Sequence, residues 1–292
     1  MQVTLSTASF AETAVDLLVL AGGSDWKSGD VAQLDARVKG ALSAEARRQR
    51  FKGTEGDLAV WQTHGALPCR YVVLAGVGNG SGPQAWYTLA HSAVTQSHAV
   101  SATSAAIAVS GERLAPVALE AIAEGVRLSS YRFRRLKSAS RSDTIGPQRL
   151  ALLVPHVSAP LRDALRRAET MAAATCYARD LINLPAAIAT PTYLAAEARR
   201  IARAPGVRVR VLDAAAIKRA GFGALLGVAQ GSAQPPRFIQ HQRPAPDESG
   251  FHHEAAHHLR RAGPARPGLH LEDRSLDRRR TERRRAGRKL DP

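Results

Sequence analysis

Aromatic residues, cysteines and long apolar runs are all scarce in this chain of 292 residues. Aromatic side chains make up only 5% of the residues while hydrophobic residues reach 45%, so a core must be built mostly from alanine, leucine, valine and isoleucine. No apolar run approaches the roughly 20 residues that a transmembrane helix requires. The N-terminus also lacks the basic and apolar segments of a signal peptide. These absences predict a cytoplasmic protein that does not enter a membrane.

The two cysteines, Cys69 and Cys176, lie too far apart in the sequence to match a zinc or redox spacing. We therefore predict two isolated reduced thiols. The formal net charge of +16 would by itself favour a nucleic acid or another anionic partner. Much of this excess lies after Arg260, in runs such as residues 278–280 and 283–285. The charge therefore predicts only nonspecific nucleic-acid binding through a basic tail.

Short apolar runs alternate with amphipathic segments along the first two thirds of the chain. We expect strands at residues 13–20, 58–61, 70–75, 105–109 and 150–154. We expect helices at residues 30–42, 84–95, 114–128 and 160–181. The strand runs are continuously apolar, which is typical of strands that are covered on both faces. This order predicts an α/β fold with a mainly parallel or mixed sheet.

Local signals set some of the expected boundaries. Asp30 can cap the helix that runs to Leu42. The segment Gly76–Gly80 follows a strand and precedes a helix. A tight turn is the simpler interpretation of this segment, and the alternative is a cradle of backbone amides for an anion such as a nucleotide phosphate. Polar residues 138–148 mark a plausible domain boundary.

Residues 175–239 organise the second part of the chain. Thr190 and Asp213 are each placed to cap a helix, and Gly221 is placed to end one. We interpret residues 221–232 as a glycine-rich segment in which backbone packs closely against backbone, and residues 235–239 as the start of a buried strand. Capping and turn formation explain Asp180 and Asn183 without a role in a site.

The composition changes after about Gln240. Residues 241–292 contain no valine or isoleucine and a single aromatic residue, Phe251, so they predict a disordered Arg/His-rich tail. Within it His253, Glu254 and His257 match a zinc-binding H-E-x-x-H pattern, in which both histidines would share one helix face. The flanking sequence offers little apolar surface to hold such a helix, and a coincidental match in a His-rich tail is the simpler interpretation.

Residues 121–239 resemble the leucyl aminopeptidase family, the cytosolic aminopeptidases that use two metal ions. The resemblance rests on four local patterns, which are Glu124–Gly125 with Ser130–Phe133, Ala178–Pro185, Thr190–Ala195, and Gly221–Ser232 with Pro235–Phe238. The earlier strands and helices agree in order with the macro-like N-terminal domain of that family. The resemblance implies hydrolysis of N-terminal amino acids from peptides, two zinc or manganese ions, and a homo-hexamer.

The family's metal ligands lie in motifs that this sequence does not contain. No Lys-Gly pair precedes an Asp-x-Gly-Gly, and Asp-Ala-Glu-Gly does not occur. We therefore predict no catalytic residue, no metal ligand and no cofactor site in this chain. The expected organisation is a macro-like domain (1–147), a linker helix region (148–184), an incomplete start of the catalytic domain (185–240) and the tail (241–292), which is interpreted as a frameshift product.

Two functional hypotheses follow. The first is an aminopeptidase relative that is truncated and inactive alone. The alternative is a non-enzymatic module that binds nucleic acid or assembles with an intact subunit.

Overall fold

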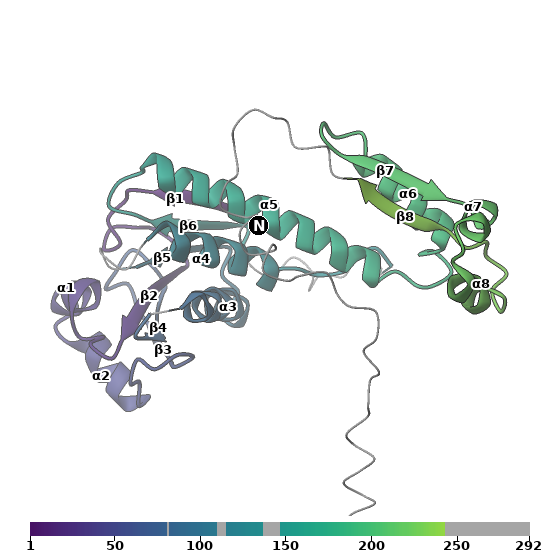
Figure 1. Ribbon diagram of the computed structural model, residues 1–292. Helices are drawn as coiled ribbons and strands as arrows, with labels where there is room; N and C mark the ends of the chain where they lie inside the picture. Colours follow the sequence, from purple (N-terminus) through teal and green to yellow (C-terminus); the bar gives the residue numbers. More distant parts are fainter. Residues whose placement is uncertain (81, 110–114, 137–146, 243–292) are drawn as a thin grey trace, which may run out of the picture. The chain divides into compact units, whose positions relative to one another are not determined.

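A computed structural model of the chain describes residues 1–80, 82–109, 115–136 and 147–242 (Figure 1). The chain divides into two compact units, Met1–Tyr193 and Leu194–Pro292, and each is described by itself. Among the helices of the described ranges, none has both the length and the apolar composition of a membrane span.

The first unit is built on a six-stranded sheet with the strand order β1-β6-β5-β2-β4-β3. Its strands are β1 (Gln2–Ser6), β2 (Leu17–Gly23), β3 (Leu58–Gln62), β4 (Tyr71–Gly78), β5 (Ser104–Ala108) and β6 (Arg149–Leu153). All neighbouring strands are parallel except β3 and β4, which are antiparallel. The predicted α/β fold with a mainly parallel sheet is confirmed.

Helices cover both faces of this sheet (Figure 1). They are α1 (Gly29–Arg37), α2 (Ala41–Arg48), α3 (Pro83–Ala99), α4 (Pro116–Ser129) and α5 (Ala159–Ile182). Side chains of β2 alternate between two cores: Leu17 and Val19 pack with α3, α4 and α5, whereas Leu18 and Leu20 pack with α1 and α2. Because both faces are buried, every residue of β2 is buried, as the continuous apolar run predicted.

The predicted helix from Asp30 to Leu42 is wrong as a single helix. Lys39 and Gly40 have φ angles of 53° and 84°, so the backbone turns left-handed there and separates α1 from α2. Asp30 does not cap α1 either, because Ser28 occupies the N-cap position and Asp30 lies in the first turn. The apolar positions of both helices, including Leu42, are nevertheless buried against the sheet.

Two strands depart from the sequence expectation, β1 because it was not predicted and β6 because of the sheet to which it belongs. The sequence analysis did not predict β1, an edge strand in which only Val3 is buried. Such a strand carries a weak apolar signal because one edge and much of its surface face solvent. β6 follows the polar segment proposed as a boundary, yet it lies between β1 and β5 in the sheet of the first unit. The domain limits at 147, 184 and 240 as a set stay a prediction.

The second unit contains a two-stranded antiparallel ribbon and short helices. Its elements are β7 (Arg208–Leu212), α7 (Ala214–Arg219), α8 (Gly223–Ala229) and β8 (Phe238–Gln242), and α6 (Pro191–Ile201) leads into it. Three local predictions are confirmed. Thr190 Oγ1 accepts a hydrogen bond from Tyr193 N at 3.2 Å, Asp213 Oδ1 accepts one from Ala216 N at 2.8 Å, and Gly221 has a φ of 76°.

Two interpretations of residues 221–239 are wrong. Backbone does not pack closely at Gly223, Gly227 or Gly231, because a Cβ atom added at any of them would meet no atom within 4 Å. Residues 223–229 instead form α8, none of whose residues is buried. The strand that starts at Phe238 does form, but Phe238 and Ile239 are 37% and 38% exposed rather than buried.

Candidate functional site

The H-E-x-x-H residues His253, Glu254 and His257 lie outside the described residues, as do residues 243–292 of the predicted disordered tail. The prediction of disorder is wrong for residues 241 and 242, which belong to β8. Among the residues that the structure describes, no group of three or more His, Cys, Asp or Glu side chains is placed to hold a metal ion. The two divalent cations implied by the resemblance require several converging ligands. The described residues do not fit such a centre.

Neither cysteine takes part in a disulfide, which confirms two free thiols. Burial raises the pKa of the Cys69 thiol to about 11. The thiolate is the nucleophilic form of cysteine. Cys69 is therefore protonated at neutral pH and acts as a small apolar side chain of the core around α1 and α2.

The glycines of the segment Gly76–Gly80 do not form an anion cradle. Gly76 and Gly78 belong to β4, so the strand continues through the predicted turn. Their N–H groups donate to the carbonyl oxygens of Asp57 at 2.8 Å and Gly53 at 2.9 Å, and Gly80 N donates to Val77 O at 2.9 Å. These three donors are already used within the protein, which leaves them no free capacity for a phosphate.

Instead, the backbone of residues 53–54 packs closely against the carboxyl ends of β2 and β4. A Cβ atom at Gly53 would lie 1.9 Å from Gly23 O, and one at Gly76 would lie 1.9 Å from Thr54 O. Phe51, two residues before Gly53, packs edge-on against Trp26, with ring centroids 5.5 Å apart. Glycine is required here by the close approach of two backbones rather than by a ligand.

Two of the sequence patterns that carry the resemblance meet between α4 and α5. Tyr131 donates a hydrogen bond to Asp180 Oδ1 at 2.7 Å and accepts one from Asn183 Nδ2 at 3.1 Å. The Arg179 guanidinium lies over the Tyr131 ring at 5.6 Å and donates to Leu128 O at 3.2 Å. Capping alone was therefore an incomplete explanation of Asp180 and Asn183, which anchor the segment after α4 to the end of α5.

The pattern Glu124–Gly125 has an equally structural role between α3 and α4. Glu124 Oε2 accepts a hydrogen bond from Tyr87 OH at 2.6 Å. Desolvation, and then this hydrogen bond, raise the pKa of Tyr87 to about 12. A Cβ atom at Gly125 would lie 2.9 Å from Ala90 Cβ, so glycine allows α3 and α4 to approach closely. These residues join helices and do not form a reactive centre.

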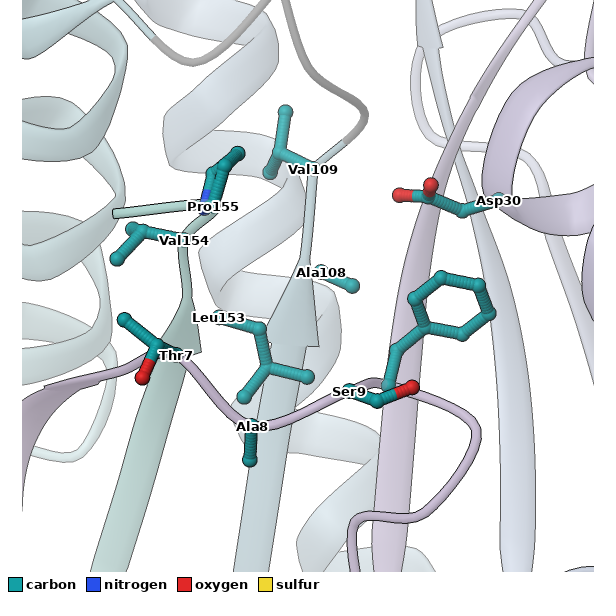
Figure 2. Close-up of a pocket in the computed structure, with 10 residues that line it drawn as sticks. Thr7, Ala8, Ser9, Asp30, Ala108, Val109, Leu153, Val154 and Pro155 are labelled. Carbon is teal, nitrogen blue, oxygen red and sulfur yellow. The ribbon is translucent and has the colours of Figure 1, made fainter. Parts of the chain in front are cut away.

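A cavity of about 230 Å³ opens at the carboxyl ends of β1, β6 and β5 (Figure 2). Its walls come from residues 7–10, 108–109 and 153–155 and from Asp30 on α1. Figure 2 shows the Asp30 carboxylate pointing from α1 toward Val109 and the ends of the strands. The sequence analysis missed this cavity, because its lining comes from four separated segments that form no motif.

Comparison with known proteins places these features in a family. Residues 17–140 match the N-terminal domain of the cytosol aminopeptidase family, and residues 176–250 match the catalytic domain of that family. A relative named "Probable cytosol aminopeptidase", from Syntrophotalea carbinolica, is 34% identical over 227 residues, which are 74% of this chain and 46% of the relative. The chain spans about half the length of the curated relatives that it matches.

Solved structures give the same picture. A mutant of tomato leucine aminopeptidase superposes with a TM-score of 0.74 at 27% identity, over 85% of this chain and 52% of the tomato chain. The bottromycin maturation enzyme BotP, solved in complex with Mn, superposes with a TM-score of 0.60 over 80% of this chain and 46% of its own. At 24% identity the second likeness concerns the fold alone.

Proposed function

Because the chain belongs to the cytosol aminopeptidase family, we propose that it supplies the parts of a metal-dependent aminopeptidase that precede the catalytic centre. These parts are the N-terminal domain, the linker helix and the entry to the catalytic domain, with the limits at 147, 184 and 240. Peptide substrates, two divalent cations, a homo-hexamer and a cytoplasmic location are properties of the whole enzyme within this proposal. The chain by itself does not hydrolyse peptides.

The proposal rests on the family's metal-ligand motifs, which do not occur in this sequence. A two-metal centre needs several carboxylate ligands that converge on ions roughly 3.5–4 Å apart. The 292 residues contain neither Asp-Ala-Glu-Gly nor a Lys-Gly pair before an Asp-x-Gly-Gly. The sequence patterns that are present hold helices together through Tyr131 and Gly125, which supports a structural role for them.

We expect the purified chain to show no metal-dependent hydrolysis of leucine p-nitroanilide with added Mn²⁺ or Zn²⁺. The measurement is the release of nitroaniline, with tomato leucine aminopeptidase as the positive control. Saturable hydrolysis that co-elutes with the protein and disappears with a chelator would contradict the proposal. Hydrolysis that separates from the protein on gel filtration would report a contaminating host enzyme.

A second candidate is the non-enzymatic module that binds nucleic acid or assembles with an intact subunit. The observation that favours it is an excess of basic residues in the second unit, where residues 194–242 contain only the carboxylates Glu197 and Asp213. Arg208 and Arg210 alternate along β7 and are both exposed, so they lie on one face of the ribbon. Such a row of guanidinium groups can contact successive phosphates.

For this module we expect weak binding to duplex DNA that falls steeply as the salt concentration rises. The double variant Arg208→Ala/Arg210→Ala should lower the slope of log K against log [salt] by about 2, because each lost phosphate contact lowers it by about 1. The matched control is Arg162→Ala/Arg166→Ala, which removes two exposed arginines from α5. Equal slopes for both double variants would reject a role for the ribbon.

A further inference from the structure

Strand β3 lies at one edge of the six-stranded sheet, where β4 is its only partner strand among the described residues. The antiparallel ladder with β4 uses every second residue of β3. Thr63 N, just after β3, donates to Arg70 O at 3.0 Å, and Asp57 O, just before β3, accepts from Gly76 N at 2.8 Å. Val60 is three positions from both ends of this ladder, so its backbone N–H and C=O groups point away from β4.

The side chain of Gln49 binds both of these outward groups. Its Nε2 donates to Val60 O at 2.7 Å, and its Oε1 accepts from Val60 N at 3.0 Å. Two residues that form a hydrogen-bonded pair in an antiparallel ladder exchange the same two bonds. The Gln49 amide therefore occupies the place that one residue of a further strand would take beside β3.

The end of α2 holds Gln49 in this position. Gln49 is the C-cap residue of α2, which lies against β3 (Figure 1). Arg50 N donates to Arg47 O at 3.0 Å, and Phe51 N donates to Ala46 O at 2.9 Å, which together form a Schellman motif. Arg50 takes the left-handed position of this motif with a φ of 59°, where glycine is the usual residue. The motif fixes the backbone that carries Gln49.

A carboxylate fixes the orientation of the amide. Glu45, one helical turn before Gln49, accepts a hydrogen bond from Gln49 Nε2. An ionised carboxylate only accepts, so it favours the orientation in which Nε2 rather than Oε1 faces it. Arg48 Nε in turn donates to Glu45 Oε2 at 2.8 Å. Both N–H groups of the amide are thereby used, and Oε1 is presented to Val60 N.

The sequence of β3 offers no protection of its own against pairing. Leu58–Gln62 contains no charged residue and no proline. The strand pairs with β4 in continuous register, without a bulge. Charged side chains, prolines and bulges are common protections of edge strands, and an edge without them can pair with another chain. Protection at the centre of β3 therefore depends on Gln49.

We propose that Gln49 keeps the sheet from adding the β3 strand of a second copy of this chain. Two β3 strands related by a twofold axis would pair antiparallel about Val60, and the two Val60 residues would exchange both hydrogen bonds. No charge repulsion opposes this pairing, because β3 is uncharged. The Gln49 amide makes the same two bonds within its own chain, so it competes directly with the second copy.

The test is the mass of the full chain in solution. Gln49→Ala should raise the weight-average mass, measured by sedimentation equilibrium, from the wild-type value toward twice that value as the protein concentration increases. The double variant Gln49→Ala/Val60→Pro should return to the wild-type mass, because proline removes the N–H donor of both intermolecular bonds and leaves the ladder with β4 intact. Gln33→Ala, which replaces an exposed glutamine of α1, is the matched control and should keep the wild-type mass.

Amide exchange followed by NMR tests the contact itself. In dilute protein the Val60 N–H should exchange at least about tenfold faster in Gln49→Ala than in the wild type, because its acceptor is lost. Gln49→Met keeps the length of the side chain without the amide and gives the same comparisons if Gln49→Ala does not fold. The proposal is overturned if the Val60 exchange rate does not change, if a folded Gln49 variant keeps the wild-type mass at every concentration, or if the double variant associates as strongly as Gln49→Ala.

Discussion

Gly53→Ala is expected to destabilise the first unit by about 4 kcal/mol or more, because two separate penalties apply. Gly53 has a φ of 80°, which costs an L-residue about 1–2 kcal/mol. The new methyl carbon would also lie 1.9 Å from the carbonyl oxygen of Gly23, which is backbone and cannot rotate away. Relief of this overlap would separate the loop from β2 and break the hydrogen bond from Gly78 N to Gly53 O.

Substitutions at two other glycines measure the cost of the φ angle and the cost of the steric overlap separately. Gly56 has a φ of 87° but would meet no atom within 4 Å, so Gly56→Ala should cost only about 1–2 kcal/mol. Gly76 would meet Thr54 O at 1.9 Å and has no unfavourable φ, so Gly76→Ala measures the overlap alone. Denaturant unfolding followed by tryptophan fluorescence reports on the first unit, since all three tryptophans lie within residues 26–86. Equal losses at Gly53 and Gly56 would show that no close approach exists.

These glycines illustrate what the sequence does not reveal. A Gly-rich segment after an apolar strand is compatible with a turn, an anion cradle or a close backbone contact, and all three require glycine. The structure distinguishes them because the decisive neighbours, Gly23 and Thr54, come from other parts of the chain. Local pattern alone correctly placed β4, but it did not show that the strand extends through Gly78.

The elements that local chemistry does determine were predicted well. β2, β4, β5 and β6 are continuous apolar runs, and the structure buries them on both faces of the sheet. Thr190 and Asp213 were assigned as caps because a side-chain oxygen next to a free N–H group is a local requirement. Lys39 adopts a left-handed conformation that its residue type disfavours, which explains why a single helix was predicted there.

Residues of the candidate site depend on contacts across long stretches of sequence. Tyr131 and Asp180 are 49 positions apart, and the cavity collects residues from positions 7 to 155. Asp180 and Asn183 lie in a sequence pattern that resembles the family. In the structure both side chains form hydrogen bonds with the Tyr131 hydroxyl, which the sequence pattern did not reveal. A family pattern in this chain therefore marks packing between helices as readily as it marks chemistry.

Asp16 is expected to give the second-largest effect, because one carboxylate joins the starts of three strands. It lies just before β2, and its Oδ2 accepts from Thr103 N and Thr103 Oγ1, both at 2.8 Å, and from Ser104 N at 3.2 Å. Arg70, before β4, lies 3.4 Å from Oδ1. Asp16→Ala should destabilise the first unit by about 2–3 kcal/mol at neutral pH, since hydrogen bonds to a charged group are stronger than neutral ones.

The Asp16 carboxylate also makes the stability of the first unit depend on pH in the acid range. Partial desolvation acts to raise the pKa of Asp16, but the hydrogen bonds from Thr103 and Ser104 and the contact with Arg70 outweigh it and lower the pKa from 3.8 to about 2. The folded state therefore binds fewer protons than the unfolded state between these values, and stability falls as the pH decreases through them. Asp16→Asn should reduce this slope, to which the lowered pKa values of Glu45 and Asp57 also contribute, and the control Asp163→Asn on α5 should leave it unchanged. Tryptophan-monitored unfolding from pH 6 to pH 2 provides the measurement, and an unchanged slope in Asp16→Asn would assign the acid sensitivity to other carboxylates.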